Sequence, residues 1–187
     1  MNDRNIHEYI ERLSNLLRNE SRKAGAAYGL LPIQIEALHY LSICNRYSNT
    51  PMGVTEYLGQ TKGTVSQSLK VLEKKGFLTK QTDCEDKRIS HLHVTQAGRD
   101  LLASIIPASL FSHACKQLST SSQTQIGDNL QQLLHAIQQS HQMKTFGVCH
   151  TCRYHQTDEQ GEGFFCGLTL EALSVDDSQL ICREHED

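Results

Sequence analysis

The chain has 187 residues, of which 38% are hydrophobic, and its formal net charge is −3. This length suits one ordinary globular domain with a small appendage. No apolar run approaches the 18 residues of a membrane span, and the polar segment 1–8 lacks the apolar core of a secretory signal. We therefore expect no membrane association and a cytoplasmic location.

The charge is unevenly distributed along the chain. Residues 50–100 carry eight Lys and Arg against six Asp and Glu, whereas residues 145–187 carry two Arg against nine acidic residues. The mildly basic central segment is therefore the candidate for contact with nucleic acid, and the acidic end is expected to avoid DNA phosphates.

Two helices are predicted before residue 50. Apolar residues between positions 5 and 24 recur at spacings of three and four, which is typical of one buried helical face, and Gly25 and Gly29 end that helix. Pro32 suits the first turn of a second helix, which ends near Asn45.

Residues 51–76 predict two short helices joined by a tight break. The first spans Pro51 to Gln60, and the second begins after Thr61 as N-cap and ends at Gly76 in a left-handed conformation. The buried residues are expected to be Val54, Tyr57 and Leu58 in the first helix and Val65, Leu69 and Leu72 in the second. This arrangement is typical of a helix-turn-helix.

A β-hairpin and two further helices are predicted next. One strand begins at residues 77–79, residues 90–95 alternate as a half-buried strand does, and a charged turn joins them. A helix over 98–118 is expected to kink at Pro107. After a polar break at 119–123, a last helix over 125–143 carries one apolar face.

The second helix of the helix-turn-helix and the hairpin carry the candidate DNA contacts. Gln67 can form two hydrogen bonds with an adenine, while Thr64 and Ser66 suit phosphates. In the hairpin turn, Arg88 is expected to enter the minor groove with its guanidinium held by Asp86 or Asp83. The predicted DNA-binding residues are Lys62, Thr64, Ser66, Gln67, Lys70, Asp86 and Arg88. The alternative for this turn is an ordinary solvated charged loop.

The order of these elements resembles the MarR family of bacterial regulators over about residues 5 to 143. The residues that carry the resemblance are Thr64-Val65-Ser66, Leu72-Glu73-Lys74-Lys75-Gly76-Phe77-Leu78, Asp86-Lys87-Arg88 and Val94-Thr95-Gln96-Ala97-Gly98. The resemblance implies a homodimer with intertwined first and last two helices that binds a pseudo-palindromic double-stranded DNA operator and usually represses. The apolar stripes at 6–17 and 126–137 independently favour a homodimer, because they need a surface to cover them.

The resemblance also implies an effector, either a small aromatic molecule or an oxidant sensed by a cysteine. Cys44 and Cys115 have apolar helical neighbours and are expected to be buried and unreactive. Cys84 is expected to be exposed, with its reactivity reduced by acidic neighbours.

The last four cysteines predict one metal centre per chain. The C-x2-C pair directs two thiolates at one point, and two more cysteines complete a tetrahedral set. The segment is too small and too poor in apolar residues to fold without a stabilising disulfide or bound metal, and cytoplasmic thiols do not form durable disulfides. The predicted ligands are Cys149, Cys152, Cys166 and Cys182, with His185 as an alternative ligand. Zinc is favoured; an iron–sulfur cluster is the alternative, because the set holds only one C-x2-C pair.

The sequence therefore predicts a mainly α protein with a small β-wing, divided into two parts. Residues 1–144 form a winged helix-turn-helix domain, with a DNA lobe at about 33–98 and dimerisation helices at about 5–24 and 98–143. Residues 145–187 form a small metal-binding module, either structural or sensory, that lies beside the dimerisation helices or docks a partner.

The function predicted is a transcriptional regulator, in particular a repressor, and not an enzyme. Two alternatives remain: a zinc-dependent enzyme that uses Glu184 near Cys182 and His185, and a protein-interaction adaptor whose helix-turn-helix no longer binds DNA.

Overall fold

The computed structural model describes residues 3–84, 86–157 and 163–186. Its elements, in chain order, are α1 (Asp3–Ala26), α2 (Pro32–Ile43), α3 (Pro51–Tyr57), α4 (Lys62–Lys74), β1 (Leu78–Thr82), β2 (Ser90–Val94), α5 (Gln96–Ile105), α6 (Ser109–Cys115), α7 (Thr120–Ser140), a 3-10 turn η1 (Cys149–Thr151), β3 (His155–Thr157), β4 (Phe164–Cys166), β5 (Glu171–Leu173) and α8 (Val175–Gln179). None of the helices within these described ranges is long and apolar enough to cross a membrane.

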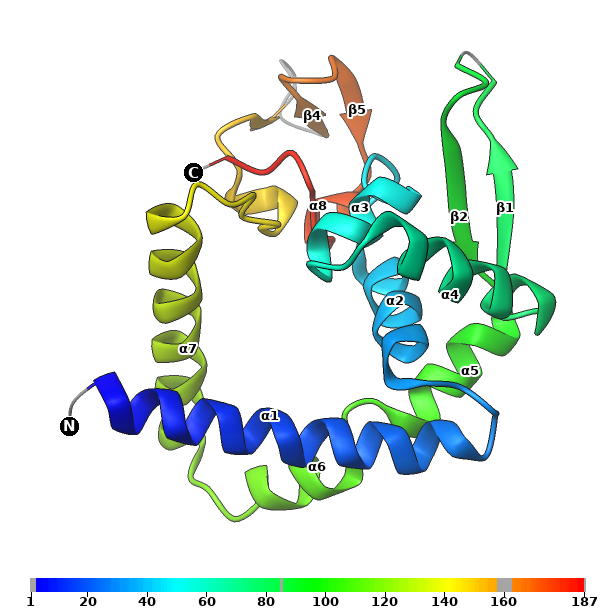
Figure 1. Ribbon diagram of the computed structural model, residues 1–187. Helices are drawn as coiled ribbons and strands as arrows, with labels where there is room; N and C mark the ends of the chain where they lie inside the picture. The colour runs from blue at the N-terminus through cyan, green and yellow to red at the C-terminus, as the bar shows by residue number, and fades with distance from the viewer. Residues whose placement is uncertain (1–2, 85, 158–162, 187) are drawn as a thin grey trace.

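The elements form an open arrangement around the two long helices (Figure 1). Helix α1 lies across one end of the molecule, and α7 rises from it on one side. The lobe formed by α2, α3, α4 and the β1–β2 hairpin stands on the other side. The strands of the C-terminal segment and the tip of the hairpin lie at the same end, opposite α1.

The hydrophobic core lies within this lobe, where α2 is packed against α4, α5 and β2. Helix α2 is buried over most of its surface, and its Leu38 and Tyr40 are fully buried. Burial of the Tyr40 hydroxyl is possible because it donates a hydrogen bond of 2.9 Å to the backbone oxygen of Ser48. The core thereby fixes the connection between α2 and α3 from inside.

Helix α4 begins and ends where its sequence predicts, whereas α3 ends at Tyr57, before the expected Gln60. The Thr61 hydroxyl caps α4 by accepting a hydrogen bond of 3.2 Å from the Thr64 amide, and Gly76 follows α4 with φ of +76°. Val54, Val65, Leu69 and Leu72 are buried as expected. The prediction for Tyr57 was wrong: its side chain is 39% exposed, and its ring stacks on Tyr40 at a centroid distance of 4.4 Å.

Two predicted helices have different limits in the structure. The helix expected over 98–118 is two helices, α5 and α6, because Pro107 lacks an amide hydrogen and disfavours helical backbone at Ile106, where φ is −126° and ψ is 130°. Most of the expected polar break at 119–123 is the first turn of α7. Ser119 caps this helix by accepting a hydrogen bond of 3.1 Å from the Ser122 amide, so α7 starts at Thr120.

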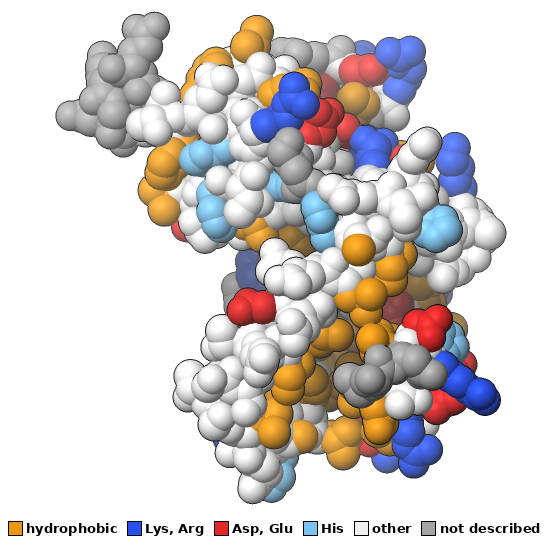
Figure 2. All heavy atoms as spheres, turned by 90° about the vertical axis from the view of Figure 1, so that its left-hand side faces the viewer, with side chains coloured by type: hydrophobic (Ala, Val, Ile, Leu, Met, Phe, Trp, Pro, Cys, Tyr) orange, Lys and Arg blue, Asp and Glu red, His pale blue; other side chains and the backbone are white. Residues whose placement is uncertain are grey.

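The apolar stripes of α1 and α7 are exposed in this single chain. Figure 2 shows hydrophobic side chains gathered on the face that carries α7 and the N-terminal end of α1. The exposed residues of the two stripes are Ile6, Tyr9, Ile10, Leu13, Leu16 and Leu17 on α1 and Ile126, Leu130, Leu134 and Ile137 on α7. An apolar surface of this kind is typical of an interface with another chain.

Candidate nucleic-acid interface and cysteine cavity

The outer face of α4 presents the polar residues that the sequence singles out. Val65 and Leu69 anchor the inner face, so Lys62, Thr64, Ser66, Gln67 and Lys70 are exposed. Beside this face lies a hollow of about 280 Å³ between α3, α4 and the hairpin. The charged residues that line it are three lysines, Lys62, Lys70 and Lys80, and one carboxylate, Glu73. The surface is therefore concave and basic, as a surface that meets DNA phosphates should be.

The tip of the β1–β2 hairpin holds Arg88 in a defined orientation. Its Nε and Nη2 donate hydrogen bonds of 2.9 and 2.7 Å to the two carboxylate oxygens of Asp86, while its side chain remains 90% exposed. Asp83 is not the partner of this guanidinium in any described contact. It accepts a hydrogen bond from the Asp86 amide at 2.8 Å. The expected bidentate pair is therefore present, and Asp86 supplies it.

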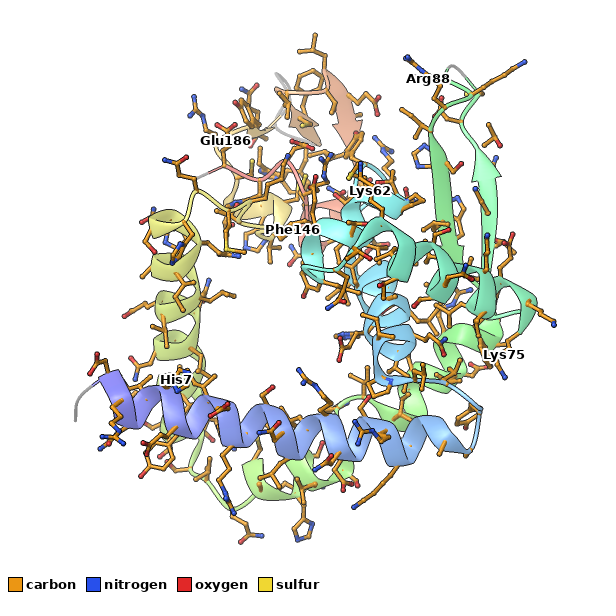
Figure 3. All side chains as sticks on the ribbon, viewed as in Figure 1. His7, Lys62, Lys75, Arg88, Phe146 and Glu186 are labelled. Atoms are coloured by element: carbon orange, nitrogen blue, oxygen red, sulfur yellow. The ribbon has the colours of Figure 1, made fainter. Side chains whose placement is uncertain are left out.

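The hairpin is fastened to the lobe at His91. One ring nitrogen, Nδ1, lies 2.6 Å from Asn49 Oδ1, and the other, Nε2, lies 3.1 Å from Asp83 Oδ2. The Leu92 amide also donates to the backbone oxygen of Asn49 at 2.7 Å. Figure 3 shows Lys62 at the start of α4 and Arg88 at the hairpin tip, both toward the same end of the molecule. His91 thus positions the hairpin relative to α3 and α4, a role that the sequence did not reveal.

The cysteine module, residues 145–187, is packed against the DNA lobe. Its Ile181 pairs with the end of α2: the Ile181 amide donates to Ile43 at 2.8 Å, and the Asn45 amide donates to Ile181 at 2.9 Å. The ring of Phe146 meets those of Tyr40 and Tyr57 edge-on, at centroid distances of 6.0 and 5.2 Å. The module was expected beside the dimerisation helices; it follows directly on α7, where Gln138 contacts Thr145, and it is also packed against the DNA lobe.

Polar contacts reinforce this docking. Arg183 donates hydrogen bonds of 2.5 and 2.9 Å to the carboxylate of Glu56 on α3, and its amide donates to Ser48 Oγ at 2.8 Å. Arg46 donates to Glu171 and to the Ala172 carbonyl of β5. Sequence reasoning missed these residues, because no motif marks the polar connection 45–49 and its partners lie more than 120 positions away.

The four predicted cysteine ligands line one small cavity of about 20 Å³. They come from three parts of the module: the η1 turn supplies Cys149 and Cys152, the end of β4 supplies Cys166, and the strand-like segment at 181 leads to Cys182. The remaining lining residues are Asn45, Tyr47, Tyr154, His155, Leu168, Thr169 and Glu184. As the described side chains stand, no three His, Cys, Asp or Glu form a group ready to hold a metal ion. The structure therefore gathers the thiols around one space without forming a finished ligand cage.

Backbone amides act on two of the sulfur atoms. The Glu186 amide donates to Cys152 Sγ at 3.5 Å. Burial raises the pKa of the Cys182 thiol, and a hydrogen bond from the Glu184 backbone amide opposes this rise because it favours the thiolate. Burial together with the neighbouring thiols raises the pKa of Cys149 to about 11. Donors directed at sulfur are a usual feature around metal-bound thiolates, whose electron density they stabilise.

Three buried polar atoms near the thiols lack a partner. Among the described side chains, the buried nitrogen and oxygen atoms without a hydrogen bond are Asn45 Nδ2, His155 Nε2 and Thr169 Oγ1. All three residues line the cysteine cavity. An unsatisfied buried donor or acceptor costs about 1–3 kcal/mol, so its presence usually marks a functional site or a missing partner.

The alternative ligand, His185, is placed elsewhere. Its Nδ1 lies 2.9 Å from the Thr145 hydroxyl, its Nε2 lies 2.9 Å from the Thr151 hydroxyl, and it does not line the cavity. Both ring nitrogens are therefore engaged in fastening the start of the module to its end.

The other three cysteines differ in exposure. Cys44 is buried, and burial raises the pKa of its thiol to about 12, in line with an unreactive residue. Cys84 is exposed as expected, whereas Cys115 is only half-buried, because α6 presents few side chains to the core.

Comparison with known proteins gives a family match over part of the chain and a shared fold. Residues 28–89 match the model of the MarR family. The transcriptional repressor MprA of Escherichia coli (strain K12) is 26% identical over 134 residues, which are 69% of this chain and 74% of MprA. These relatives are MarR-family transcriptional regulators, which are not enzymes.

Solved structures show the same fold. The S. aureus MepR–DNA complex has a TM-score of 0.58 at 22% identity, covering 70% of this chain and 96% of MepR. Streptococcus pneumoniae FabT in complex with DNA has a TM-score of 0.59 at 23% identity, covering 74% of this chain and 99% of FabT. A MarR regulator from Methanosarcina mazei Go1 reaches a TM-score of 0.63 at 19% identity, with 72% and 96% coverage. The family model thus matches the part of the chain that holds the helix-turn-helix, and the solved structures show that the chain shares the fold of these proteins.

Proposed function

We propose that this protein is a DNA-binding transcriptional repressor that acts as a homodimer on a pseudo-palindromic operator. The observation that carries the proposal is the exposed polar face of α4 beside a hairpin that projects Arg88. Two neighbours of the same fold, MepR and FabT, were solved in complex with DNA, and the relative MprA is named a repressor.

Helix α4 and the β1–β2 hairpin contact different parts of the DNA. Helix α4 enters the major groove, where Gln67 reads a base edge and Lys62 and Lys70 contact phosphates. The hairpin follows the backbone and places Arg88 in the adjacent minor groove, with Asp86 keeping the guanidinium oriented before DNA arrives. Pre-orientation lowers the entropy lost on binding.

The homodimer follows from the exposed apolar stripes. One helix-turn-helix reads few bases, and a two-fold dimer places two of them about one helical turn apart on DNA. The stripes of α1 and α7 supply a surface that a second copy can cover. This assembly also explains why the elements of one chain leave so much apolar surface open.

Selection from a random double-stranded DNA library tests the proposal. Purified protein should enrich an inverted repeat whose half-site centres lie about 10 base pairs apart. A variant with Gln67→Ala should lose preference at one position of each half-site, whereas Glu8→Ala, at an exposed position of α1, should enrich the same sequence as the wild type. Enrichment of no sequence, or of single unpaired half-sites only, would contradict the proposal.

The cysteine cavity extends the proposal to one zinc ion per chain. Four thiols line one cavity, a backbone amide donates to one of the sulfurs, and three buried polar atoms of the lining lack a hydrogen-bond partner. The side chains would turn inward to give zinc its four-sulfur tetrahedron. A space of about 20 Å³ is close to that of one water molecule, which suits a single ion better than a four-iron cluster.

Metal analysis of anaerobically purified protein tests this part separately. We expect about one zinc per chain, a colourless sample, and loss of the metal in Cys149→Ser. Cys44→Ser removes a buried thiol outside the cavity and should retain the zinc. A brown sample with iron and sulfide would replace zinc by a cluster. A metal-free protein with a folded module would end the metal proposal while leaving the DNA-binding proposal intact.

A further inference from the structure

The connection between α2 and α3 contributes both to the cysteine cavity and to the DNA lobe. Asn45 lines the cysteine cavity, yet it lies directly after α2 in the DNA lobe. Its Oδ1 accepts a hydrogen bond of 2.7 Å from Ser48 Oγ, and its Nδ2 is one of the unpartnered donors. Asn45 is 1% exposed, so water does not satisfy that donor from outside. The atom therefore needs an acceptor inside the cavity.

A metal-bound thiolate is the acceptor that the surroundings offer. Asn45 and Cys182 line the same cavity, and the Asn45 backbone amide donates a hydrogen bond of 2.9 Å to the carbonyl of Ile181, the residue before Cys182. A thiolate is a much stronger hydrogen-bond acceptor than a thiol, and metal binding removes the thiol proton. Filling the centre would thus give Asn45 Nδ2 its missing partner and hold the Asn45–Ser48 turn.

The residue after Cys182 extends this link to α3. The Arg183 amide donates to Ser48 Oγ, and its guanidinium is paired with both oxygens of Glu56. Glu56 stands on α3, the helix that packs directly against α4. Cys182 is therefore separated from the DNA-reading helix by only one ion pair and one helix.

The module also reaches the dimerisation helix. The Gln138 side chain of α7 donates to the Thr145 carbonyl at 3.0 Å, and the Thr145 hydroxyl contacts His185. Figure 3 shows Phe146, at the start of the module, between the end of α7 and α3. One small module thus contacts both the helix expected to pair with a second copy and the lobe expected to read DNA.

We propose that the zinc-filled cysteine centre holds the DNA lobe in its binding position through Asn45, Ser48 and the Arg183–Glu56 pair. This inference rests on the proposed function and adds the regulation of the same DNA-binding site. Loss of zinc frees Cys182, loosens the turn 45–48 and lets α3 and α4 move relative to α7. Because two lobes must match two half-sites together, freedom in each lobe lowers operator affinity.

The test measures operator affinity in zinc-loaded protein and in protein stripped with 1,10-phenanthroline under reducing conditions. The probe is the duplex enriched from the random library. We expect stripping to lower the affinity of the wild type at least tenfold, within the usual range of coupling between two sites, and added zinc ions to restore it. Hydrogen exchange of the α3 amides should be slower in the loaded form, a readout that does not involve DNA.

Glu56→Ala removes the ion pair with Arg183 and leaves every cysteine in place. We expect this variant to retain one zinc per chain but to show less than a twofold difference in affinity between loaded and stripped forms. Glu8→Ala, which removes an exposed ion pair with Arg4 on α1, should keep the tenfold response. A second variant, Asn45→Asp, keeps the acceptor for Ser48, loses the donor, and should also reduce the response.

The possible outcomes distinguish a failure of the coupling between zinc and DNA binding from a failure of the proposed DNA-binding function. If zinc-loaded and stripped wild type bind the operator equally and their α3 amides exchange hydrogen at equal rates, the proposed coupling is wrong. The DNA-binding site and the zinc site are not contradicted by that result. If the protein selects no operator, the proposed DNA function fails before coupling is measured. If Glu56→Ala keeps the full tenfold response, the route through Arg183 is overturned.

Discussion

Arg183 and Glu56 lie 127 positions apart in the sequence and form a two-point ion pair between the cysteine module and α3. Arg183 donates through Nε and Nη2, so the planar guanidinium fits the carboxylate with both oxygens engaged. Both side chains are only partly exposed, at 25% and 31%. This ion pair therefore joins the cysteine module, which the family resemblance does not cover, to α3 of the helix-turn-helix.

The Glu56 carboxylate makes the stability of this junction depend on pH. The hydrogen bonds from Arg183 hold the pKa of Glu56 below its usual value of 4.5. A lowered pKa contributes stability above the unfolded pKa, and this contribution is lost as the pH falls through the folded value. Glu56→Gln should therefore lower the free energy of unfolding at pH 7 by about 1 kcal/mol or less, given the partial exposure.

Thermal unfolding between pH 7 and pH 3.5 measures this difference. The gap in Tm between wild type and Glu56→Gln should be largest at pH 7 and should close below about pH 4.5. Glu8→Gln, in the exposed Arg4–Glu8 pair, is the matched control and should change Tm little. A gap that widens as the pH falls would refute the assignment to Glu56.

The Asp86–Arg88 pair gives a prediction for DNA binding. Arg88→Ala should weaken operator binding and lower the slope of log affinity against log salt by about one, since one phosphate-region cation is lost. Asp86→Asn keeps the cation but removes the carboxylate that orients it, so affinity should fall while the slope stays the same. Equal slopes for wild type and Arg88→Ala would show that the hairpin tip does not reach DNA.

The parts of the structure that sequence predicted are those set by local rules. Thr61 can cap α4 and Gly76 can end it because each acts on the backbone within four residues. The same local rule applied to Pro107 identified an interruption, although the sequence indicated a kink where the structure has a break. The Asp86–Arg88 pair could be predicted from the sequence for the same reason, since the two residues share one tight turn.

The docking of the cysteine module lies beyond such rules. The backbone pairing of Ile181 with the end of α2 joins residues far apart in the chain, and no periodicity encodes it. The sequence identified the four cysteines by spacing, and the structure places all of them at one cavity, but Asn45 gave no signal of its own. His185 had a ligand-like spacing and a different role, because the Thr145 and Thr151 hydroxyls occupy its nitrogens.

The apolar stripe of α7 gives a prediction for assembly. Leu130 is 48% exposed in the single chain and lies at the centre of the stripe. Leu130→Asp should place a charge in the proposed interface, where an unpaired buried charge is strongly unfavourable, so the dimer should dissociate. Light scattering should report about 42 kDa for the wild type, twice the chain mass of 21.0 kDa, and the monomer mass for the variant.

Gln132→Asp is the matched control for this change. Gln132 is exposed and stands on the opposite side of α7, two residues and about 200° around the helix from Leu130. The control should remain dimeric at the same concentration. A wild type that scatters as a monomer, or a control that dissociates as readily as Leu130→Asp, would remove α7 from the interface.

Gly98 gives a prediction for the junction between α5 and the hairpin. A Cβ atom at this position would lie 2.3 Å from the Phe77 carbonyl oxygen and 2.8 Å from Val94 Cγ1, so backbone must shift to admit it. Gly98→Ala should therefore lower the free energy of unfolding by about 1–3 kcal/mol, the usual cost of overpacking. Gly63→Ala, on α4, meets only Thr61 Oγ1 at 3.8 Å and should be neutral or stabilising by up to about 1 kcal/mol. Denaturant unfolding of both variants measures the contrast, and equal stability would show that β1 and α5 are not packed as closely as the structure places them.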